Sequence, residues 1–116
     1  MNLSGIEQGE LIVADIMFAE QDSKKRRLAL VVSSTSYNKH SSDIVVLKVT
    51  SKTNFSGYSV ELSNDFTEKK ALRKESVVRA DFPVTISRQN IYARPDMVKP
   101  EKLLEVKLKL GKLFGL

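Results

Sequence analysis

Arg79 and Asp81 are the residues whose types and spacing point most directly to chemistry. They alternate with the apolar Val78 and Ala80 in the segment 76–81, which has the pattern of a short strand. Alternate residues of a strand share a face, so the two Cβ atoms would lie roughly 6.5–7 Å apart and both side chains could reach one small group. A carboxylate that accepts a proton, beside a cation that holds a phosphate, suffices for RNA cleavage by the substrate's own 2′-hydroxyl. The same spacing also fits an ordinary surface ion pair, which contributes little to stability.

Further polar side chains stand at the ends of two other expected strands. Arg26 and Arg27 directly precede a short apolar run, and their planar guanidinium groups suit phosphate oxygens. Thr50 and Ser51 end another apolar run with hydroxyls that could donate to a phosphate, and Lys52 adds a charge. Each has an ordinary alternative: a solvated basic loop for the arginines, and local turn hydrogen bonds for the hydroxyls.

Phe55 and His40 are the remaining candidates. Phe55 lies in a polar loop, where an exposed aromatic ring could stack on an unpaired base, although it could also pack beneath the loop. His40, the only histidine, is expected to be a solvated loop residue. One histidine and no cysteine exclude a thiolate nucleophile, an iron–sulfur cluster and a metal site that needs two imidazoles. We therefore expect the chemistry to use carboxylates, hydroxyls and arginines, and we expect no metal or other cofactor.

Length and composition predict one globular domain spanning residues 1–116. The chain has 41% hydrophobic and 28% charged residues, without repeats or a Pro/Gly-rich linker. Glu7, Glu10 and Asp15 occur where a signal peptide would need a basic flank and an apolar run, and no apolar stretch is long enough to span a bilayer. A cytoplasmic protein is therefore expected. The net charge of +5 is compatible with a polyanionic partner without requiring one.

Hydrophobic patterning predicts a succession of short strands followed by one helix. The expected strands cover residues 11–18, 28–32, 43–50, 58–62, 76–81 and 91–93. The segment 33–43 is polar and turn-rich, with room for one helical turn. Pro100 suits a first helical position, and apolar residues at helical spacing continue to Phe114. The prediction is a mainly β fold, a small and strongly bent antiparallel sheet or barrel closed by a C-terminal helix.

The order of these segments along the chain resembles the MazF/PemK toxin family. The resemblance extends over nearly the whole chain, and only residues 19–25 and 63–72 lack a clear counterpart in the family. The short pieces that carry it are residues 9–15, 27–33, 37–38, 49–52, 76–81 and 99–103. The resemblance implies an SH3-like barrel that forms a homodimer, cleaves single-stranded RNA without a metal and is neutralised by an antitoxin protein. It also implies products with 2′,3′-cyclic phosphate and 5′-hydroxyl ends.

The resemblance assigns catalytic residues in two ways. In the PemK-like branch the Val-Val-Arg-x-Asp strand supplies the pair, which corresponds to Arg79 and Asp81. In the MazF-like branch the pair is the arginine before the second strand and the threonine that ends the third, which correspond to Arg27 and Thr50. We expect Asp81 to act as base toward the 2′-hydroxyl, both arginines to stabilise charge on the phosphorane, and Thr50 to orient a non-bridging oxygen. A guanidinium stays protonated in proteins, so the acid that protonates the 5′-oxygen is left unassigned.

The resemblance also indicates which residues bind RNA, and two positions depart from the family pattern. The residues expected to contact RNA are Arg26, Ser51, Lys52 and Phe55. Leu28 stands where the family usually has proline, and Val84 where it usually has arginine, which affects RNA affinity and the dimer interface rather than the catalytic candidates.

Two other functions fit the same fold. One is a non-catalytic barrel that binds a protein target, as gyrase-poisoning relatives do, and the other is a single-strand binder that does not cleave. The cleavage sequence is expected to depend on the loops 19–26, 33–42 and 52–58.

Overall fold

The computed structural model describes residues 5–18, 25–51 and 56–116. Their strands form one six-stranded antiparallel sheet: β1 (Glu10–Ile16), β2 (Lys25–Val31), β3 (Asp43–Ser51), β4 (Ser59–Leu62), β5 (Ser76–Ser87) and β6 (Ile91–Met97). The helices are α1 (Thr35–His40) and α2 (Pro100–Phe114), with short 3₁₀ turns at Asn64–Phe66 and Arg88–Asn90. No helix among the described residues is long and apolar enough to cross a membrane.

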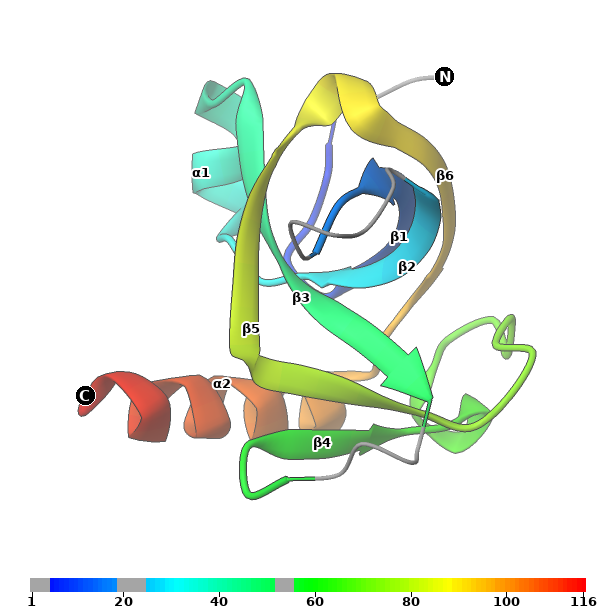
Figure 1. Cartoon of the computed structure of the whole chain (residues 1–116), viewed down its shortest axis with the longest axis vertical. Coiled ribbons are helices and arrows are strands. Elements are labelled where there is room, and N and C mark those ends of the chain that lie inside the picture. Colours follow the sequence, from blue (N-terminus) through cyan, green and yellow to red (C-terminus); the bar gives the residue numbers. More distant parts are fainter. Residues whose placement is uncertain (1–4, 19–24, 52–55) are drawn as a thin grey trace.

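The sheet curls into a barrel-like shape. Its strand order is β4-β5-β3-β2-β1-β6, so within the described residues the edge strands β4 and β6 do not pair with each other. Figure 1 shows β1, β2, β3, β5 and β6 arranged around a ring, with α2 crossing its base beside β4. The predicted mainly β, barrel-like fold with a C-terminal helix is confirmed, although the sheet does not close.

The two faces of the sheet bury separate hydrophobic cores. Ala29 and Val46 pack with neighbours inside the curl, whereas Leu30 and Leu47 pack on the other face, together with Val106 of α2. Burial on both faces explains why β2 and β3 read as continuous apolar runs rather than as alternating ones. The strand ends, which extend beyond these cores, are therefore the places where polar side chains can gather.

Three strands differ most from the sequence prediction. β2 begins at Lys25, inside the segment expected to be a loop, because it pairs with β1 from Ile16 onward. β6 continues through Pro95, which an edge strand tolerates because one side of its backbone needs no partner. β5 continues past Asp81 to Ser87 and changes direction sharply along its length (Figure 1). The expected helical turn in 33–43 is confirmed as α1.

An irregularity in β5 accompanies this change of direction. On β3 the adjacent residues Leu47 and Lys48 pair with Pro83 and Arg79 respectively, so residues 80–82 have no partner on that strand. On the other side, the Ala80 amide still donates to the Tyr58 carbonyl at 3.0 Å. A bulge of this kind bends the strand and turns its side chains away from the ladder. The bulge contains Asp81.

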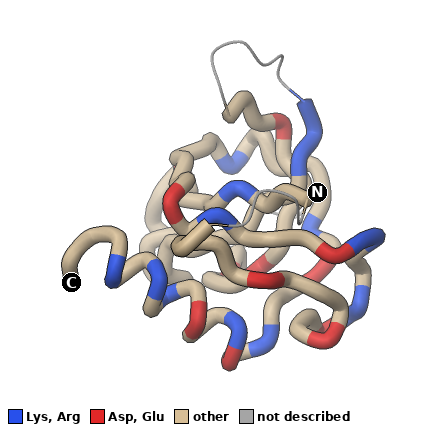
Figure 2. The backbone as a smooth tube through the Cα atoms, turned by 60° about the horizontal axis from the view of Figure 1, so that its bottom comes forward, with Lys and Arg blue, Asp and Glu red and all other residues tan. Residues whose placement is uncertain are grey.

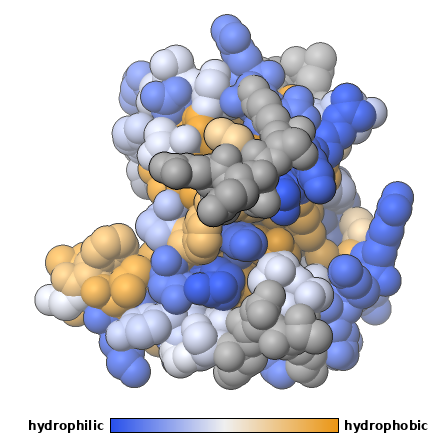
Figure 3. Space-filling model, in the orientation of Figure 1, coloured by the Kyte–Doolittle hydropathy of each residue, from blue (hydrophilic) through white to orange (hydrophobic). Residues whose placement is uncertain are grey.

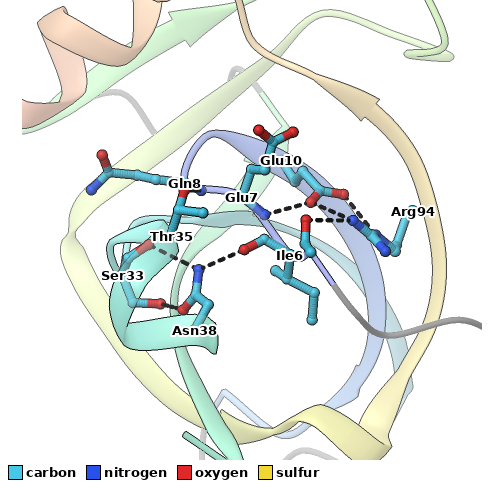
Figure 4. A network of polar contacts seen from close by, with 9 residues as sticks. Ile6, Glu7, Gln8, Glu10, Ser33, Thr35, Asn38 and Arg94 are labelled. Carbon is cyan, nitrogen blue, oxygen red and sulfur yellow. Dashed lines mark hydrogen bonds and ion pairs between the residues drawn. The ribbon is translucent and has the colours of Figure 1, made fainter. Parts of the chain in front are cut away.

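A polar network fastens the N-terminal segment to the barrel (Figure 4). Arg94 of β6 forms an ion pair with Glu10 at 2.7 Å and donates to the Gly5 carbonyl at 3.2 Å. The Asn38 amide of α1 donates to the Ile6 carbonyl at 3.2 Å. The hydrogen bond from Arg94 to Glu10 raises the pKa of the arginine. These contacts hold the segment that leads into β1.

Candidate active site

Arg79 and Asp81 form a two-point ion pair at the bulge. The Arg79 Nε atom donates to Oδ1 of Asp81 at 2.8 Å, and Nη2 donates to Oδ2 at 3.1 Å. Both side chains are 25% exposed, so a ligand can reach them. The shared face predicted from the alternation of β5 is observed, and the bulge frees Asp81 from the ladder with β3.

The electrostatics of the pair follow from this contact. The Arg79 hydrogen bond lowers the pKa of Asp81, and it outweighs the opposing effect of partial burial. The same hydrogen bond raises the pKa of Arg79. At neutral pH the site therefore presents a carboxylate and a guanidinium, joined and partly exposed.

Three cations converge on two aromatic rings beside this pair. Phe18 and Phe82 meet edge to face, with centroids 5.5 Å apart. The Lys48 Nζ atom lies 5.4 Å from the Phe18 centroid and 4.9 Å from that of Phe82. The guanidinium carbon of Arg27 lies 5.6 Å from the Phe18 centroid, and that of Arg79 lies 5.9 Å from the Phe82 centroid. We call Arg27, Lys48 and Arg79 the cationic cluster, which contacts of this type hold in place.

The strand register also directs Thr50 toward this end of the sheet. Ala29 of β2 pairs with Lys48 of β3, and the next residues on the same face of each strand are Arg27 and Thr50. Thr50 itself pairs with residue Val77 of β5. The two candidate pairs from the sequence thus lie on neighbouring strands at one end of the sheet.

Arg26 and Ser51 lie elsewhere, in a groove on the opposite face. The groove has a volume of about 770 Å³. We call it the basic groove; its polar lining residues are Arg26, Thr50, Ser51, Arg73, Lys74, Ser76 and Asp96, and its apolar ones include Leu11, Val13, Leu28, Val49 and Leu72. Arg26 also stacks on the Tyr92 ring at 3.6 Å and lies 3.8 Å from an Asp15 carboxylate oxygen.

Lys52 and Phe55 lie outside the described residues, so their expected RNA contacts stay predictions. His40 is exposed at the end of α1, just before β3 begins, whereas Thr50 lies near the end of that strand. The histidine is thus separated from the site by the length of β3. In the described part of the chain, His, Asp and Glu side chains form no group of three that could hold a metal ion.

Lys48, Phe18 and Phe82 also belong to the candidate site, although they are not among the site residues expected from the sequence. Lys48 interrupts an apolar strand two residues before Thr50, and this alternation is a signal that places both on one face. The two phenylalanines carry no such signal, because their meeting depends on the curl of the sheet.

Charge and hydropathy vary across the surface. Figure 2 shows Lys and Arg on several elements, interspersed with acidic residues along α2. Figure 3 shows hydrophilic side chains in the middle of one face and a hydrophobic patch at the C-terminal end of α2. The exposed apolar side chains of that end include Leu108, Phe114 and Leu116.

Comparisons with known proteins show which family and which solved structures this chain resembles. A family model described as "PemK-like, MazF-like toxin of type II toxin-antitoxin system" matches residues 7–114. The structure resembles MazF from Deinococcus radiodurans at 26% identity and a TM-score of 0.77, covering 96% of this chain and 97% of that one. It resembles a MazE–MazF crystal structure from the same organism at 27% identity and a TM-score of 0.76, covering 97% and 98%.

A solved structure of lower sequence identity has the same fold. An endoribonuclease from a mycobacterial species is 18% identical with a TM-score of 0.76, covering 97% of this chain and 94% of that one. A comparison with curated protein sequences gave no match.

Proposed function

Because the chain belongs to the PemK-like, MazF-like toxins of type II toxin–antitoxin systems, we propose that it is an endoribonuclease that cleaves single-stranded RNA without a metal ion. The membership agrees with the family expected from the sequence. The observation that carries the proposed activity is the Arg79–Asp81 pair, partly exposed at the bulge of β5, where Arg79 belongs to the cationic cluster. It combines a proton acceptor with a phosphate-binding cation.

The proposed reaction uses the RNA 2′-hydroxyl as nucleophile. Asp81 accepts the proton of this hydroxyl while its oxygen attacks the adjacent phosphorus. Arg79 and Arg27 stabilise the charge that develops on the phosphorane, and the Thr50 hydroxyl donates to a non-bridging oxygen. The products are an RNA end with a 2′,3′-cyclic phosphate and an end with a 5′-hydroxyl.

Substrate binding activates Asp81 in this proposal. In the free protein, the hydrogen bond from Arg79 lowers the pKa of Asp81 and so makes it a weak base. An arriving phosphate competes for the same guanidinium fork, because Arg binds phosphate with two parallel hydrogen bonds. As Arg79 turns toward the phosphate, Asp81 loses that hydrogen bond and becomes more basic. The base is thus strengthened only when substrate is present.

The basic groove extends the proposed RNA-binding surface. Its Arg26, Arg73 and Lys74 side chains suit phosphates of flanking nucleotides, and its apolar lining suits bases. Ser51 adds a hydroxyl donor at the same place. An RNA strand that passes the end of β3 would contact both the cationic cluster and this groove, since Thr50 lines the groove and shares a sheet face with Lys48.

Protein partners follow from the family and its neighbours. MazF of Deinococcus radiodurans has been crystallised with MazE, and a mycobacterial endoribonuclease with its cognate antitoxin. We propose that an antitoxin protein likewise neutralises this chain, that the chain forms a homodimer, and that it acts on messenger RNA in the cytoplasm. Sedimentation that gives only a 13 kDa species at micromolar concentration would contradict the dimer.

The activity is tested by incubating the purified protein with a long single-stranded RNA in excess EDTA. We expect discrete fragments from the wild-type protein and intact RNA from an Arg79→Ala/Asp81→Ala double variant. Intact RNA recovered from a stable complex with the wild-type protein would instead indicate a single-strand binder. Intact RNA without a complex would indicate a barrel that targets a protein.

A further inference from the structure

Lys48 occupies the centre of the cationic cluster. It pairs with Arg79 across β3 and β5, and its half-buried side chain places Nζ near both aromatic rings, 4.9 Å from the Phe82 centroid and 5.4 Å from the Phe18 centroid. Within the residues that the structure describes, no oxygen atom accepts a hydrogen bond from this ammonium group. Its N–H donors are therefore available to a ligand.

The surroundings of Lys48 favour an anion as that ligand. The guanidinium groups of Arg27 and Arg79 flank the same two rings, so three positive charges meet within one small region. Of these three, Arg79 is neutralised by Asp81. A phosphate bound here would relieve the repulsion among the cations and would accept hydrogen bonds from the ammonium group.

The proposed reaction lacks a proton donor for the departing 5′-oxygen. Asp81 is used as the base, and the guanidinium groups of the cluster stay protonated throughout. His40 is excluded because it precedes β3, at the far end of the strand from the site. A lysine ammonium, unlike a guanidinium, takes part readily in proton transfer.

The placement of Lys48 suits the geometry of the displacement. In an in-line reaction the attacking and departing oxygens lie on opposite sides of the phosphorus, so base and acid must approach from different directions. Asp81 projects from the bulge of β5, whereas Lys48 projects from the neighbouring strand β3. Arg79 pairs with Lys48 across the strands and hydrogen-bonds Asp81, so it is a neighbour of both.

We propose that Lys48 binds the scissile phosphate and protonates the 5′-oxygen as the leaving group departs. This role rests on the ribonuclease function proposed above. The 2′-oxygen–phosphorus bond forms as Asp81 takes the 2′-hydroxyl proton, and the phosphorus–5′-oxygen bond breaks with its electron pair remaining on the oxygen. That oxygen takes a proton from Nζ. Lys48 is left as a neutral amine and Asp81 as a carboxylic acid, and exchange with water restores both.

The test compares two RNA oligonucleotides that differ in one leaving-group atom. One has the normal 5′-oxygen at a single cleavage site, and the other has sulfur at that position, which departs as a thiolate without needing a proton. Single-turnover rates are measured for wild-type protein and for Lys48→Met, Lys48→Arg and Asp81→Asn. Lys107→Met, an exposed lysine of α2, is the matched control and should cleave both substrates like wild type.

We expect Lys48→Met to cleave the oxygen substrate at least about 100-fold more slowly, the usual range for loss of a general acid. On the sulfur substrate its rate should fall far less, because a thiolate departs without general-acid help and only the phosphate contact of Lys48 is lost. Lys48→Arg keeps the charge but not the ability to give up a proton, so it should show the same contrast. Asp81→Asn should be slow on both substrates, since each needs the base.

Three outcomes would overturn the proposal. Equal slowing of both substrates by Lys48→Met would show that Lys48 only binds the phosphate, and full activity of Lys48→Arg on the oxygen substrate would show that only its charge matters. If Lys48→Met does not fold, the rates of Lys48→Arg on the two substrates alone show whether Lys48 donates a proton. Wild-type protein that cleaves neither substrate would overturn the ribonuclease function itself, and the role of Lys48 with it.

Discussion

Asp81 owes its position to two neighbours of different kinds. The guanidinium of Arg79 holds both of its oxygens, and the bulge of β5 releases its backbone from the ladder with β3. The first contact keeps the carboxylate ionised, and the second exposes it to a ligand. In the proposed reaction the bulge lets the carboxylate reach a ribose hydroxyl, and Arg79 must release it before it can act as a base.

Asp81→Asn tests the role of this carboxylate directly. The amide has nearly the same shape but cannot accept the proton, so we expect RNA cleavage to fall about 10²- to 10⁴-fold with an unchanged melting temperature. Single-turnover cleavage and thermal unfolding measure the two effects, with Asp65→Asn, an exposed aspartate, as control. Full cleavage by Asp81→Asn would instead assign catalysis to Arg27 and Thr50.

The pH titration of Asp81 tests the ion pair itself. Because the Arg79 hydrogen bond lowers the pKa of this carboxyl group, it should titrate below the ordinary aspartate range of about 3.9. It therefore stays ionised as the pH falls through that range and gains its proton only at lower pH. In Arg79→Ala the pKa of Asp81 should rise toward the ordinary value. NMR of the side-chain carboxyl carbon gives both values, and an unchanged pKa of Asp81 in the variant would contradict the assignment.

β5 illustrates, at the level of an element, which features can be predicted from sequence. The alternation of residues 76–81 correctly predicts a strand with Arg79 and Asp81 on one face. It does not predict the continuation to Ser87, because Pro83 interrupts the pattern that a regular strand would show. The continuation depends on pairing with β3, a contact between distant parts of the chain.

In the candidate site, too, some residues can be predicted from sequence and others cannot. The arginine and hydroxyl candidates at strand ends are apparent from composition and spacing. The association of Lys48 with Phe18 and Phe82 is not, because it requires the register of the strands and the curl of the sheet. The same register places Arg26 and Ser51 in the basic groove rather than in the cationic cluster.

Asp96 holds the loop that forms one wall of the basic groove. It is only 4% exposed, and its carboxylate accepts backbone hydrogen bonds from Lys69 and Ala71 of that loop at 2.8 and 2.9 Å. Burial alone would favour the neutral acid, but these bonds and those from Met97 and Thr67 outweigh it and lower the pKa of Asp96. The loop therefore depends on an ionised buried carboxylate.

Asp96→Asn should weaken this attachment. An amide offers one acceptor oxygen where the carboxylate offers two, so we expect a loss of about 2 kcal/mol in the free energy of unfolding at pH 7. Because the folded-state pKa of Asp96 is lowered, its contribution is complete above the unfolded value of about 3.9 and disappears as the pH falls through the lower folded value. The difference between wild type and variant should therefore shrink in acid.

Urea unfolding at neutral and acidic pH measures this difference. Glu68→Gln, an exposed change in the same loop, serves as the control for loss of one negative charge. Equal stability of wild type and Asp96→Asn at pH 7 would contradict the anchoring role.

In the whole molecule, one curled sheet both buries the hydrophobic cores and positions the cationic side chains. Its two faces bury separate cores, which stabilise a chain of only 116 residues. Its strand ends carry cations on both faces, the cationic cluster on one and the basic groove on the other. The net charge of +5, which by itself indicates no particular partner, is thus arranged so that a polyanion can contact two connected surfaces.

RNA affinity should depend strongly on salt. If about four phosphates are neutralised on a single strand, the logarithm of the binding constant should fall with the logarithm of salt concentration with a slope of roughly −3. Fluorescence anisotropy with the Asp81→Asn variant, which does not consume the RNA, measures this slope. An Arg73→Ala/Lys74→Ala variant should reduce it by about one to two units, because each lost phosphate contact removes roughly 0.7. A slope near zero would contradict binding by these cations.

The most direct test of the proposed 2′-hydroxyl mechanism is the chemistry of the cleaved ends. RNA is cleaved in excess EDTA, the sites are mapped, and the products are analysed alongside a substrate with a single 2′-deoxy nucleotide at a mapped site. We predict fragments with 2′,3′-cyclic phosphate and 5′-hydroxyl ends, and no cleavage at the 2′-deoxy position. Products with 3′-hydroxyl and 5′-phosphate ends, or cleavage at the 2′-deoxy nucleotide, would show that the 2′-hydroxyl is not the nucleophile and would contradict the roles given to Asp81 and Arg79.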